Sequence, residues 1–353
     1  MDAAAILVVR LSSLGDVILS SSFLQSCREH FPASRIDFVV REDLLPVASA
    51  LPEVQRVIAV RREARLPTLL ALGARLAREG YAHVFDLHQS ARSRLLTWRL
   101  QRHLRRGFSK QGLPRWILLR FHRDLYDRFG GGVPLRERML KPLRRLGYNS
   151  RLHDTQLVIP MPAQARAATL LADIGPQETC VGVAPGARWS AKRWPVERWA
   201  ALVAELARTP QRRFILLGDA SEKALSGPIV AAAPGRCIDL VGELDILESA
   251  AVLQRCCAAL GHDSALMHAA EAVGRPVLTF FGPTTPRFGY APYRSRSRVL
   301  HRPPPCNPCS KNGSRPCMRP THECMENIGV PTALAAASEL LAHVAEDALE
   351  QTL

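Results

Sequence analysis

The sequence has no long uninterrupted hydrophobic run. None of its apolar stretches approaches the roughly 18 to 20 residues that a membrane-spanning helix needs. The N-terminus has no basic region before an apolar run and no small-residue cleavage site, so we expect no signal peptide. We therefore expect the protein to stay in the cytoplasm, where its nine cysteines are reduced.

Familiar nucleotide-binding and metal fingerprints are also missing. The chain contains no GxGxxG motif, no Walker A loop and no Asp-x-Asp motif. Aromatic residues make up only 6% of the chain, which leaves few side chains for stacking on single-stranded nucleic acid. The usual nucleotide fingerprints are therefore absent, and the scarcity of aromatic residues argues against a single-strand nucleic-acid binder.

What is present is a globular composition with a strongly basic balance. The 353 residues are 47% apolar and 22% charged, and this length favours two domains. The net charge of +15 is uneven, because the stretch from Arg92 to Arg145 holds 16 Lys plus Arg and only 3 Asp plus Glu. Such a cluster suits an anionic partner, namely nucleic acid, anionic lipid or a phosphorylated substrate. The alternative is a solvated basic face.

Apolar strand-like runs alternate with helical stretches, which predicts parallel sheets covered by helices. After Ile6–Val9, strands are expected at Ile36–Val40, Val57–Val60 and His83–Leu87. A second, more regular series starts at Cys180–Ala184, after a Pro- and Gly-containing junction. We therefore predict an α/β protein with a domain over 1–160 that carries a basic insert at about 90–147, a domain over 177–330, and a final helix within 331–353.

The loop after the first strand reads Arg10-Leu-Ser-Ser-Leu-Gly-Asp16 and leads into a helix. Ligands of open α/β sheets bind at the carboxyl ends of strands, which is where this loop lies. Asp16 is therefore either a functional carboxylate or a residue that caps the helix, and its local sequence does not separate the two.

The basic stretch contains a segment, Leu113–Phe129, with apolar residues at every fourth position. Four arginines interrupt it, at positions 115, 120, 123 and 128. This pattern predicts a basic amphipathic helix, which either packs on the core with a charged outer face or lies on an anionic membrane surface. We favour the packed helix, with membrane contact as an additional role.

Three loops of the second half have the composition of an anion or sugar site. The loop from Gly186 to Lys192 joins a strand to a helix and offers backbone N–H groups and cations for phosphate. Glu222 or Asp219 follows the next strand and suits ribose hydroxyls, or simply favours a helix start. Asp263 and Ser264 open a further helix, with His268 one turn later, facing either the site or the core.

Four cysteines, Cys306, Cys309, Cys317 and Cys324, lie within nineteen residues of a Pro-rich stretch. A CxxC pair followed by two more cysteines resembles a structural zinc site, with His322 as a possible substitute ligand. The alternative is a reduced cluster without metal.

Together these motifs resemble the ADP-heptose:lipopolysaccharide heptosyltransferases, the ninth family of glycosyltransferases. The resemblance rests on the Arg10–Asp16 loop, the Pro185-Gly186…Lys192-x-Trp194-Pro195 loop, Asp263–His268, and Phe281-Gly-Pro-Thr284 followed by Phe288-Gly289. It implies a GT-B fold of two Rossmann-like domains facing a cleft, with acceptor in the first and nucleotide sugar in the second. It also implies that the last helix returns to the first domain.

The resemblance further implies inverting, metal-independent transfer of heptose from ADP-L-glycero-β-D-manno-heptose to the inner core of lipopolysaccharide. Asp16 would be the general base, and Lys192 would stabilise the leaving diphosphate. The donor would be held by the residues that match the family's motifs, Gly186, Ala187, Arg188, Glu222, Asp263, Ser264, Ala265, Leu266 and His268. The acceptor would meet Ser12, Ser13, Gly15, Arg115, Arg120 and Arg123.

An acidic lipid-linked acceptor implies an enzyme peripheral to the cytoplasmic face of the inner membrane, without a specific nucleic-acid partner. The chain departs from the family at Ala265, where glycine is usual, and alanine adopts positive φ less readily. Two alternatives remain open at this point. One is a GT-B glycosyltransferase with another sugar nucleotide or acceptor, and the other is a non-catalytic anion-binding protein.

Overall fold

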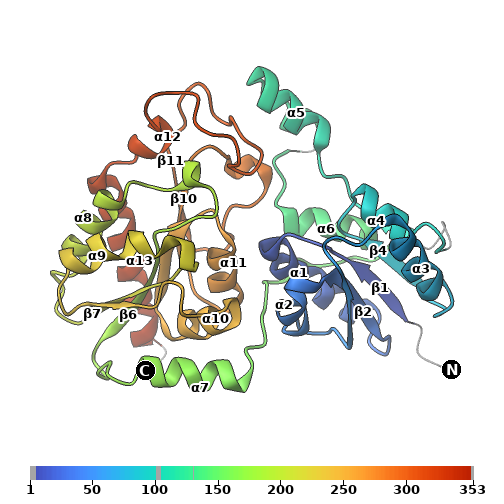
Figure 1. The fold of residues 1–353 in the computed structure, drawn as a ribbon, viewed down its shortest axis with the longest axis horizontal. Helices are drawn as coiled ribbons and strands as arrows, with labels where there is room; N and C mark the ends of the chain where they lie inside the picture. Colours follow the sequence, from blue (N-terminus) through green and yellow to red (C-terminus); the bar gives the residue numbers. More distant parts are fainter. Residues whose placement is uncertain (1–4, 101–104, 130, 351–353) are drawn as a thin grey trace. The chain divides into compact units, whose positions relative to one another are not determined.

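The computed structural model describes residues 5–100, 105–129 and 131–350. These residues form two compact units, one made of residues up to 112 with 133–158, and one made of 113–132 with 159 onwards (Figure 1). The first boundary was predicted near 160, and the chain passes into the second unit between Val158 and Ile159. Helix α7, Met161–Leu170, accordingly belongs to the second unit.

The first unit is a five-stranded parallel sheet with strand order β3-β2-β1-β4-β5. Strand β1 is fully buried, as expected of a central parallel strand made of branched apolar residues. Its elements are β1 (Ile6–Val9), α1 (Leu14–His30), β2 (Ile36–Arg41), α2 (Leu45–Ser49), β3 (Arg56–Val60), α3 (Leu66–Ala77), β4 (His83–Asp86), α4 (Ala91–Leu96), β5 (Arg105–Gly107) and α6 (Leu135–Arg144).

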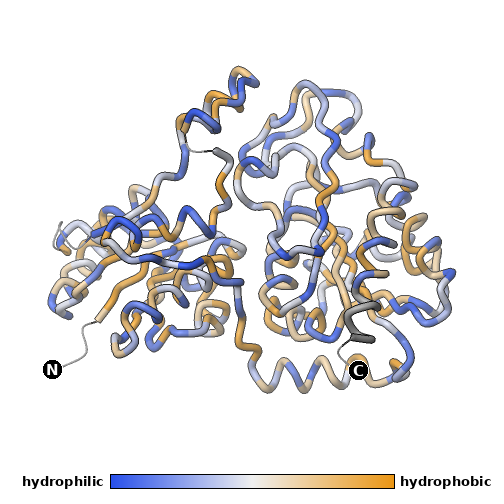
Figure 2. Tube along the Cα trace, turned by 180° about the vertical axis from the view of Figure 1, so that it is seen from behind, coloured by the Kyte–Doolittle hydropathy of each residue, from blue (hydrophilic) through white to orange (hydrophobic). Residues whose placement is uncertain are grey.

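The second unit is a six-stranded parallel sheet with strand order β11-β10-β9-β6-β7-β8. Hydrophobic residues follow its central strands in Figure 2. Its elements, after α5 (Gly112–Phe121) and α7, are β6 (Thr179–Ala184), α8 (Val196–Leu206), β7 (Arg212–Leu216), the 3₁₀ helix η4 (Ala220–Leu225), α9 (Ser226–Ala232), β8 (Cys237–Asp239), α10 (Ile246–Arg255), β9 (Ala258–His262), α11 (Ala265–Ala272), β10 (Val277–Phe281), β11 (Arg298–His301), α12 (Glu323–Glu326) and α13 (Val330–Glu350).

The predicted strands of the first half are all present, with boundaries within one residue. The short strands β5 and β11 were not predicted. Each lies at an edge of its sheet and has few branched apolar residues, so neither shows the periodicity of a buried strand. Among the described residues, no helix is both long and apolar enough to cross a membrane.

The last helix differs from the expectation that it returns to the first domain. Helix α13 packs against α8 and strands β9, β10 and β11, all within the second unit. Ala333, Ala337 and Leu340 are fully buried there in the unit's main core. Their spacing forms one apolar helix stripe, which the second sheet covers.

The segment predicted as one helix from Leu113 to Phe129 is also different. Helix α5 ends at Phe121, His122 has a positive φ of 52°, and a 3₁₀ helix, η2, follows at Tyr126–Phe129. The segment belongs to the second unit, so the basic insert is divided between the units rather than contained in the first. The predicted every-fourth-residue stripe is not the buried face, because Leu113, Phe121 and Phe129 are exposed.

Candidate active site

In the first unit, β1 lies between β2 and β4. The chain continues from β1 to β2 and β3 on one side of β1, and then crosses to β4 and β5 on the other side. Loops that follow the strands at such a switch point form the usual ligand site of an open α/β sheet. Val9 and Asp86 are partners at the ends of β1 and β4. The loop with Asp16 and the loop with His88 therefore begin side by side.

Asp16 lies in the first turn of α1 and is 8% exposed. Its Oδ2 accepts hydrogen bonds from the Ser13 backbone N–H at 2.9 Å and from the Ser13 hydroxyl at 2.8 Å. Its Oδ1 lies 2.6 Å from Nη2 of Arg10. The capping role considered for Asp16 is thus present, although Ser13 occupies the N-cap position and Asp16 the third helical residue.

The same contacts determine the charge of Asp16. Burial raises its pKa, but the charge and hydrogen bond of Arg10, together with the bonds from Ser13, outweigh burial and lower the pKa to about 2. Asp16 is therefore an anion at neutral pH. Ser12 is half-buried beside this group, Ser13 is exposed and Gly15 is buried in α1, so these predicted acceptor residues do lie together.

His88 is a neighbour of the Asp16 loop that the sequence did not single out. Its Nδ1 lies 3.1 Å from the carbonyl oxygen of Ser12, to which the ring N–H donates. Buried Asp86 accepts from the backbone N–H of His88 and of Gln89, at 3.0 and 2.8 Å. Burial, and then the charges of Arg10 and Lys110, lower the pKa of His88 to about 4, so the ring is neutral. The available signal was its position directly after a predicted strand.

The second unit has the same switch point between β6 and β9. Nζ of Lys192, from the loop after β6, lies 2.6 Å from Oδ2 of Asp263, from the loop after β9. Nζ also donates to the Asp263 carbonyl at 2.9 Å, and the Thr284 hydroxyl donates to Oδ2 at 3.1 Å. Three βα loops thereby hold one largely buried cation in a fixed place.

A buried histidine connects the same two loops. His262, the last residue of β9, has Nδ1 at 2.9 Å from the Gly186 carbonyl, and its Nε2 accepts from the Trp194 backbone N–H at 2.8 Å. This pair of bonds requires the neutral ring with hydrogen on Nδ1. Burial is the largest cause that lowers the pKa of His262 to about 4.

Glu222 packs directly on the loop after β6. It is 7% exposed, accepts from the Asp219 N–H at 2.9 Å, and lies 3.8 Å from Arg193. A Cβ on Gly186 would lie 2.1 Å from the Glu222 carboxyl carbon, so glycine is what permits this approach. Burial raises the pKa of Glu222, partly offset by the Asp219 bond and the Arg193 charge.

The remaining predicted donor residues occupy the ends of the same loops. Ser264 is the N-cap of α11, and its buried Oγ makes no hydrogen bond within the described part of the chain. Ala265 and Leu266 form the first helical turn, so alanine at 265 sits in ordinary helical backbone and needs no positive φ. Ala187 and His268 are buried.

Arg188 is exposed, with its guanidinium 5.2 Å from the ring centre of Trp189. The three predicted acceptor arginines, Arg115, Arg120 and Arg123, lie in the segment that clusters with the second unit. The Asp16 loop belongs to the first unit.

The four clustered cysteines are unpaired and line one small cavity together with His322. Burial and the neighbouring thiols raise the pKa of Cys309, and burial is the main cause that raises the pKa of Cys324 to about 12. No group of three or more His, Cys, Asp or Glu side chains in the described residues is arranged to hold a metal ion. The structure therefore does not support the predicted zinc site.

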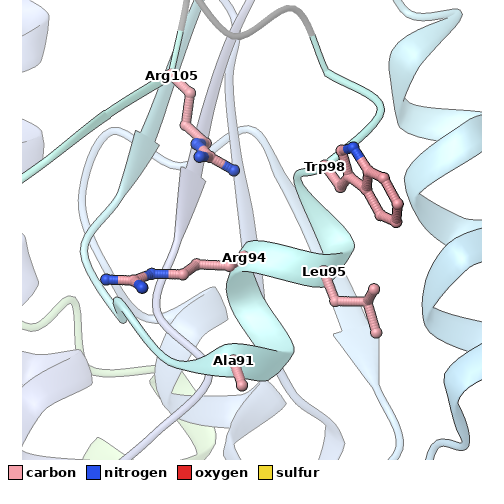
Figure 3. A pocket seen from close by; sticks show the side chains of 5 residues that line it. All are labelled: Ala91, Arg94, Leu95, Trp98 and Arg105. Atoms are coloured by element: carbon pink, nitrogen blue, oxygen red, sulfur yellow. The ribbon is translucent and has the colours of Figure 1, made fainter.

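A larger, open cavity of about 360 Å³ lies in the first unit, between α4 and β5 (Figure 3). It is lined by Ala91, Arg94, Leu95, Trp98 and Arg105. None of the predicted catalytic or donor residues lines it.

The model of glycosyltransferase family 9 (heptosyltransferase) matches residues 69–317. The chain is 29% identical to lipooligosaccharide heptosyltransferase 2 of Haemophilus influenzae, over 80% of this chain and 84% of that protein. It is 28% identical to lipopolysaccharide heptosyltransferase 1 of Pseudomonas aeruginosa, over 87% of this chain and 86% of that one.

Among solved structures, E. coli ADP-heptose lps heptosyltransferase II matches with a TM-score of 0.72 at 24% identity, covering 96% of this chain and 99% of that one. This likeness and the two parallel sheets confirm the predicted GT-B fold class. Because the family model covers more than half of the sequence, the chain belongs to glycosyltransferase family 9, the heptosyltransferases.

Proposed function

We propose that this chain transfers heptose from ADP-L-glycero-β-D-manno-heptose to a sugar hydroxyl of the lipopolysaccharide inner core. Relatives named as lipopolysaccharide and lipooligosaccharide heptosyltransferases cover four-fifths or more of the chain and support this substrate class. The observation in the chain itself that carries the proposal is the Lys192–Asp263–Thr284 contact, where three loops at one switch point fix a cation.

The second unit binds the donor in this proposal. Departure of ADP from the anomeric carbon places growing negative charge on the diphosphate. Lys192 and the N-terminal N–H groups of α11 offset that charge, and their positions are set before the donor arrives. The unpartnered Ser264 hydroxyl donates to the donor, and Glu222, held by Asp219, accepts from the ribose hydroxyls.

The first unit supplies the base. Asp16 takes the proton of the acceptor hydroxyl while the hydroxyl oxygen attacks the anomeric carbon from the face opposite to ADP, which inverts the configuration. With a pKa of about 2, the resting carboxylate is a weak proton acceptor. An acceptor hydroxyl that displaces Ser13 or Arg10 from Asp16 removes a contact that keeps the pKa low, which makes Asp16 more basic when the acceptor is bound.

The acceptor is acidic and attached to lipid, and the chain has a matching excess of positive charge between Arg92 and Arg145. We place the enzyme at the cytoplasmic face of the inner membrane on this basis. The proposal includes no metal in the transfer step, since Lys192 and the α11 N-terminus supply the positive charge that a metal provides elsewhere.

A transfer assay tests this proposal. Purified protein is given ADP-heptose, ADP-glucose or UDP-glucose, with inner-core acceptors that carry no heptose or one heptose, in the presence and absence of EDTA. We expect transfer with ADP-heptose to exceed transfer with the other donors by at least about a hundredfold, and EDTA to leave it unchanged. Equal use of all donors, or no transfer together with salt-sensitive DNA binding, would overturn the proposal.

A further inference from the structure

Helix α5 has an unusual distribution of side chains. Pro114, Arg115 and Leu118 form its buried side, while Leu113, Trp116 and Phe121 are each more than half exposed. Leu113, Trp116 and Arg120 are spaced so that they share one helix face. An exposed helix face normally carries polar residues, so this face needs an explanation. We refer to Leu113, Trp116, Arg120, Phe121 and Arg123 as the α5 surface.

Contacts on the opposite side set the orientation of the segment. Leu118 packs with Tyr126 and Phe288, and the Arg115 guanidinium lies 4.9 Å above the Phe288 ring centre. Arg287, next to Phe288, forms ion pairs with Asp124 and Asp127 in the turn that follows α5. These contacts hold one side of α5 against the second unit and leave the α5 surface outward.

The acidic side chains of this segment pair with the second unit, whereas two of its basic side chains lie on the exposed side. Its two carboxylates, Asp124 and Asp127, both pair with Arg287, at 2.7 and 3.0 Å. Arg120 and Arg123 are exposed and form no ion pair with any described residue. The Arg120 guanidinium lies 5.3 Å from the ring centre of Phe121, whose ring meets Trp116 edge-on at 5.5 Å. The α5 surface is therefore apolar and aromatic, with unneutralised positive charge beside it.

This combination fits the interface of a bilayer that contains anionic phospholipid. Tryptophan and phenylalanine enter the region between headgroups and acyl chains, and arginines remain at the headgroup phosphates. A duplex nucleic acid would use the arginines but has no apolar layer in which to bury Leu113 and Trp116, and stacking on a single strand would leave Leu113 unused. Figure 2 shows hydrophobic and hydrophilic residues interleaved along α5, as an interfacial helix requires.

We infer that the α5 surface inserts into the headgroup region of an anionic membrane and holds the enzyme there. The inference deepens the proposed function, since its purpose rests on a lipid-linked acceptor. It is tested without donor or acceptor, so its failure is distinct from a failure of transfer.

The test measures binding of the full chain to vesicles by co-sedimentation. Vesicles of phosphatidylcholine alone are compared with vesicles that contain about 30% phosphatidylglycerol. We expect Trp116→Ser with Phe121→Ser, and separately Arg120→Gln with Arg123→Gln, to weaken binding to the anionic vesicles about tenfold or more. Both pairs are exposed, so thermal melting and ADP binding of these variants should match the parent.

Helix α3 provides matched controls. Leu66 has the same 56% exposure as Trp116, and Arg75 and Arg78 are an exposed arginine pair. We expect Leu66→Ser, and Arg75→Gln with Arg78→Gln, to leave vesicle binding within about twofold of the parent. Equal weakening by the α3 and α5 variants would overturn the inference. So would loss of binding on arginine replacement alone with Trp116 and Phe121 dispensable, since that pattern indicates nonspecific charge attraction to the vesicle surface rather than insertion.

Discussion

At the scale of single residues, Asp16 combines two roles that its sequence context left unseparated. It stabilises the start of α1 through the Ser13 N–H, and it places an ionised carboxylate at the switch point of the first sheet. Both carboxylate oxygens are already engaged, because Oδ2 receives both bonds from Ser13 while Oδ1 faces Arg10. In the proposed mechanism, an acceptor hydroxyl therefore has to compete with Ser13 and Arg10 for this carboxylate.

His262 provides a residue-scale prediction on pH. Its folded pKa of about 4 lies below the ordinary value of 6.5, so the unfolded chain binds more protons between these values. Stability is then lost as the pH falls from 6.5 to 4, by up to about 3 kcal/mol from this residue. Urea unfolding at pH 7, 6 and 5 should show a shallower loss for His262→Gln. A variant with the same pH slope as the parent would contradict the prediction.

A site residue can be predicted from the sequence when its local position indicates a role, but not when a distant contact partner defines its place. Lys192, Asp263 and Glu222 were singled out because each lies in the segment that joins a strand to the next helix, where ligands of α/β sheets bind. The contact of His88 with the Asp16 loop was missed because its partner, the Ser12 carbonyl, is 76 residues away along the chain. A contact between residues so far apart along the chain cannot be predicted from motif spacing.

At the scale of elements, the β6 loop and η4 contact each other closely in the proposed donor half-site. Gly186 faces the Glu222 carboxyl so closely that any side chain at 186 has to displace it. We expect Gly186→Ala to destabilise the protein by about 1–3 kcal/mol and to weaken ADP binding at least about tenfold. Urea unfolding and calorimetry of ADP binding measure the two effects.

Gly227 is the matched control for that substitution. It lies in α9 of the same unit, and a Cβ there meets nothing within 4 Å. Gly227→Ala should leave ADP binding unchanged and stabilise the helix by about 0.5–1 kcal/mol. If both glycine variants bind ADP like the parent, then Glu222 does not contact the donor in the way proposed.

The elements also show where periodicity misleads. Positions 113, 117, 121, 125 and 129 predicted an apolar stripe toward the core. In the structure the helix ends at Phe121, and Leu118 and Tyr126 are the residues that pack on Phe288. The final helix was correctly expected, but its docking partner was not, because an apolar stripe specifies that a face is buried and not which sheet buries it.

At the scale of the whole molecule, the alternation of strands and helices was sufficient to predict two parallel-sheet units. The division of the basic stretch was beyond sequence reasoning, since residues 113–132 leave the first unit and cluster with the second although both flanks stay in the first. Long-range contacts such as Arg287 with Asp124 and Asp127 produce this grouping.

The central claim is that an ionised Asp16 in the first unit activates the acceptor for a donor held by the second unit. Asp16→Asn keeps the size of the side chain and removes the negative charge, while Ser13→Ala keeps the carboxylate and removes only the hydroxyl bond. Both variants are expected to bind ADP like the parent, because the proposed donor residues belong to the other unit.

The measurement is kcat for transfer from ADP-heptose to the inner-core acceptor, for the parent, Asp16→Asn and Ser13→Ala. We expect kcat to fall about 10²- to 10⁴-fold for Asp16→Asn and less than about tenfold for Ser13→Ala, with ADP affinity unchanged in both. A folded Asp16→Asn protein that binds ADP and transfers heptose as fast as the parent would contradict the account.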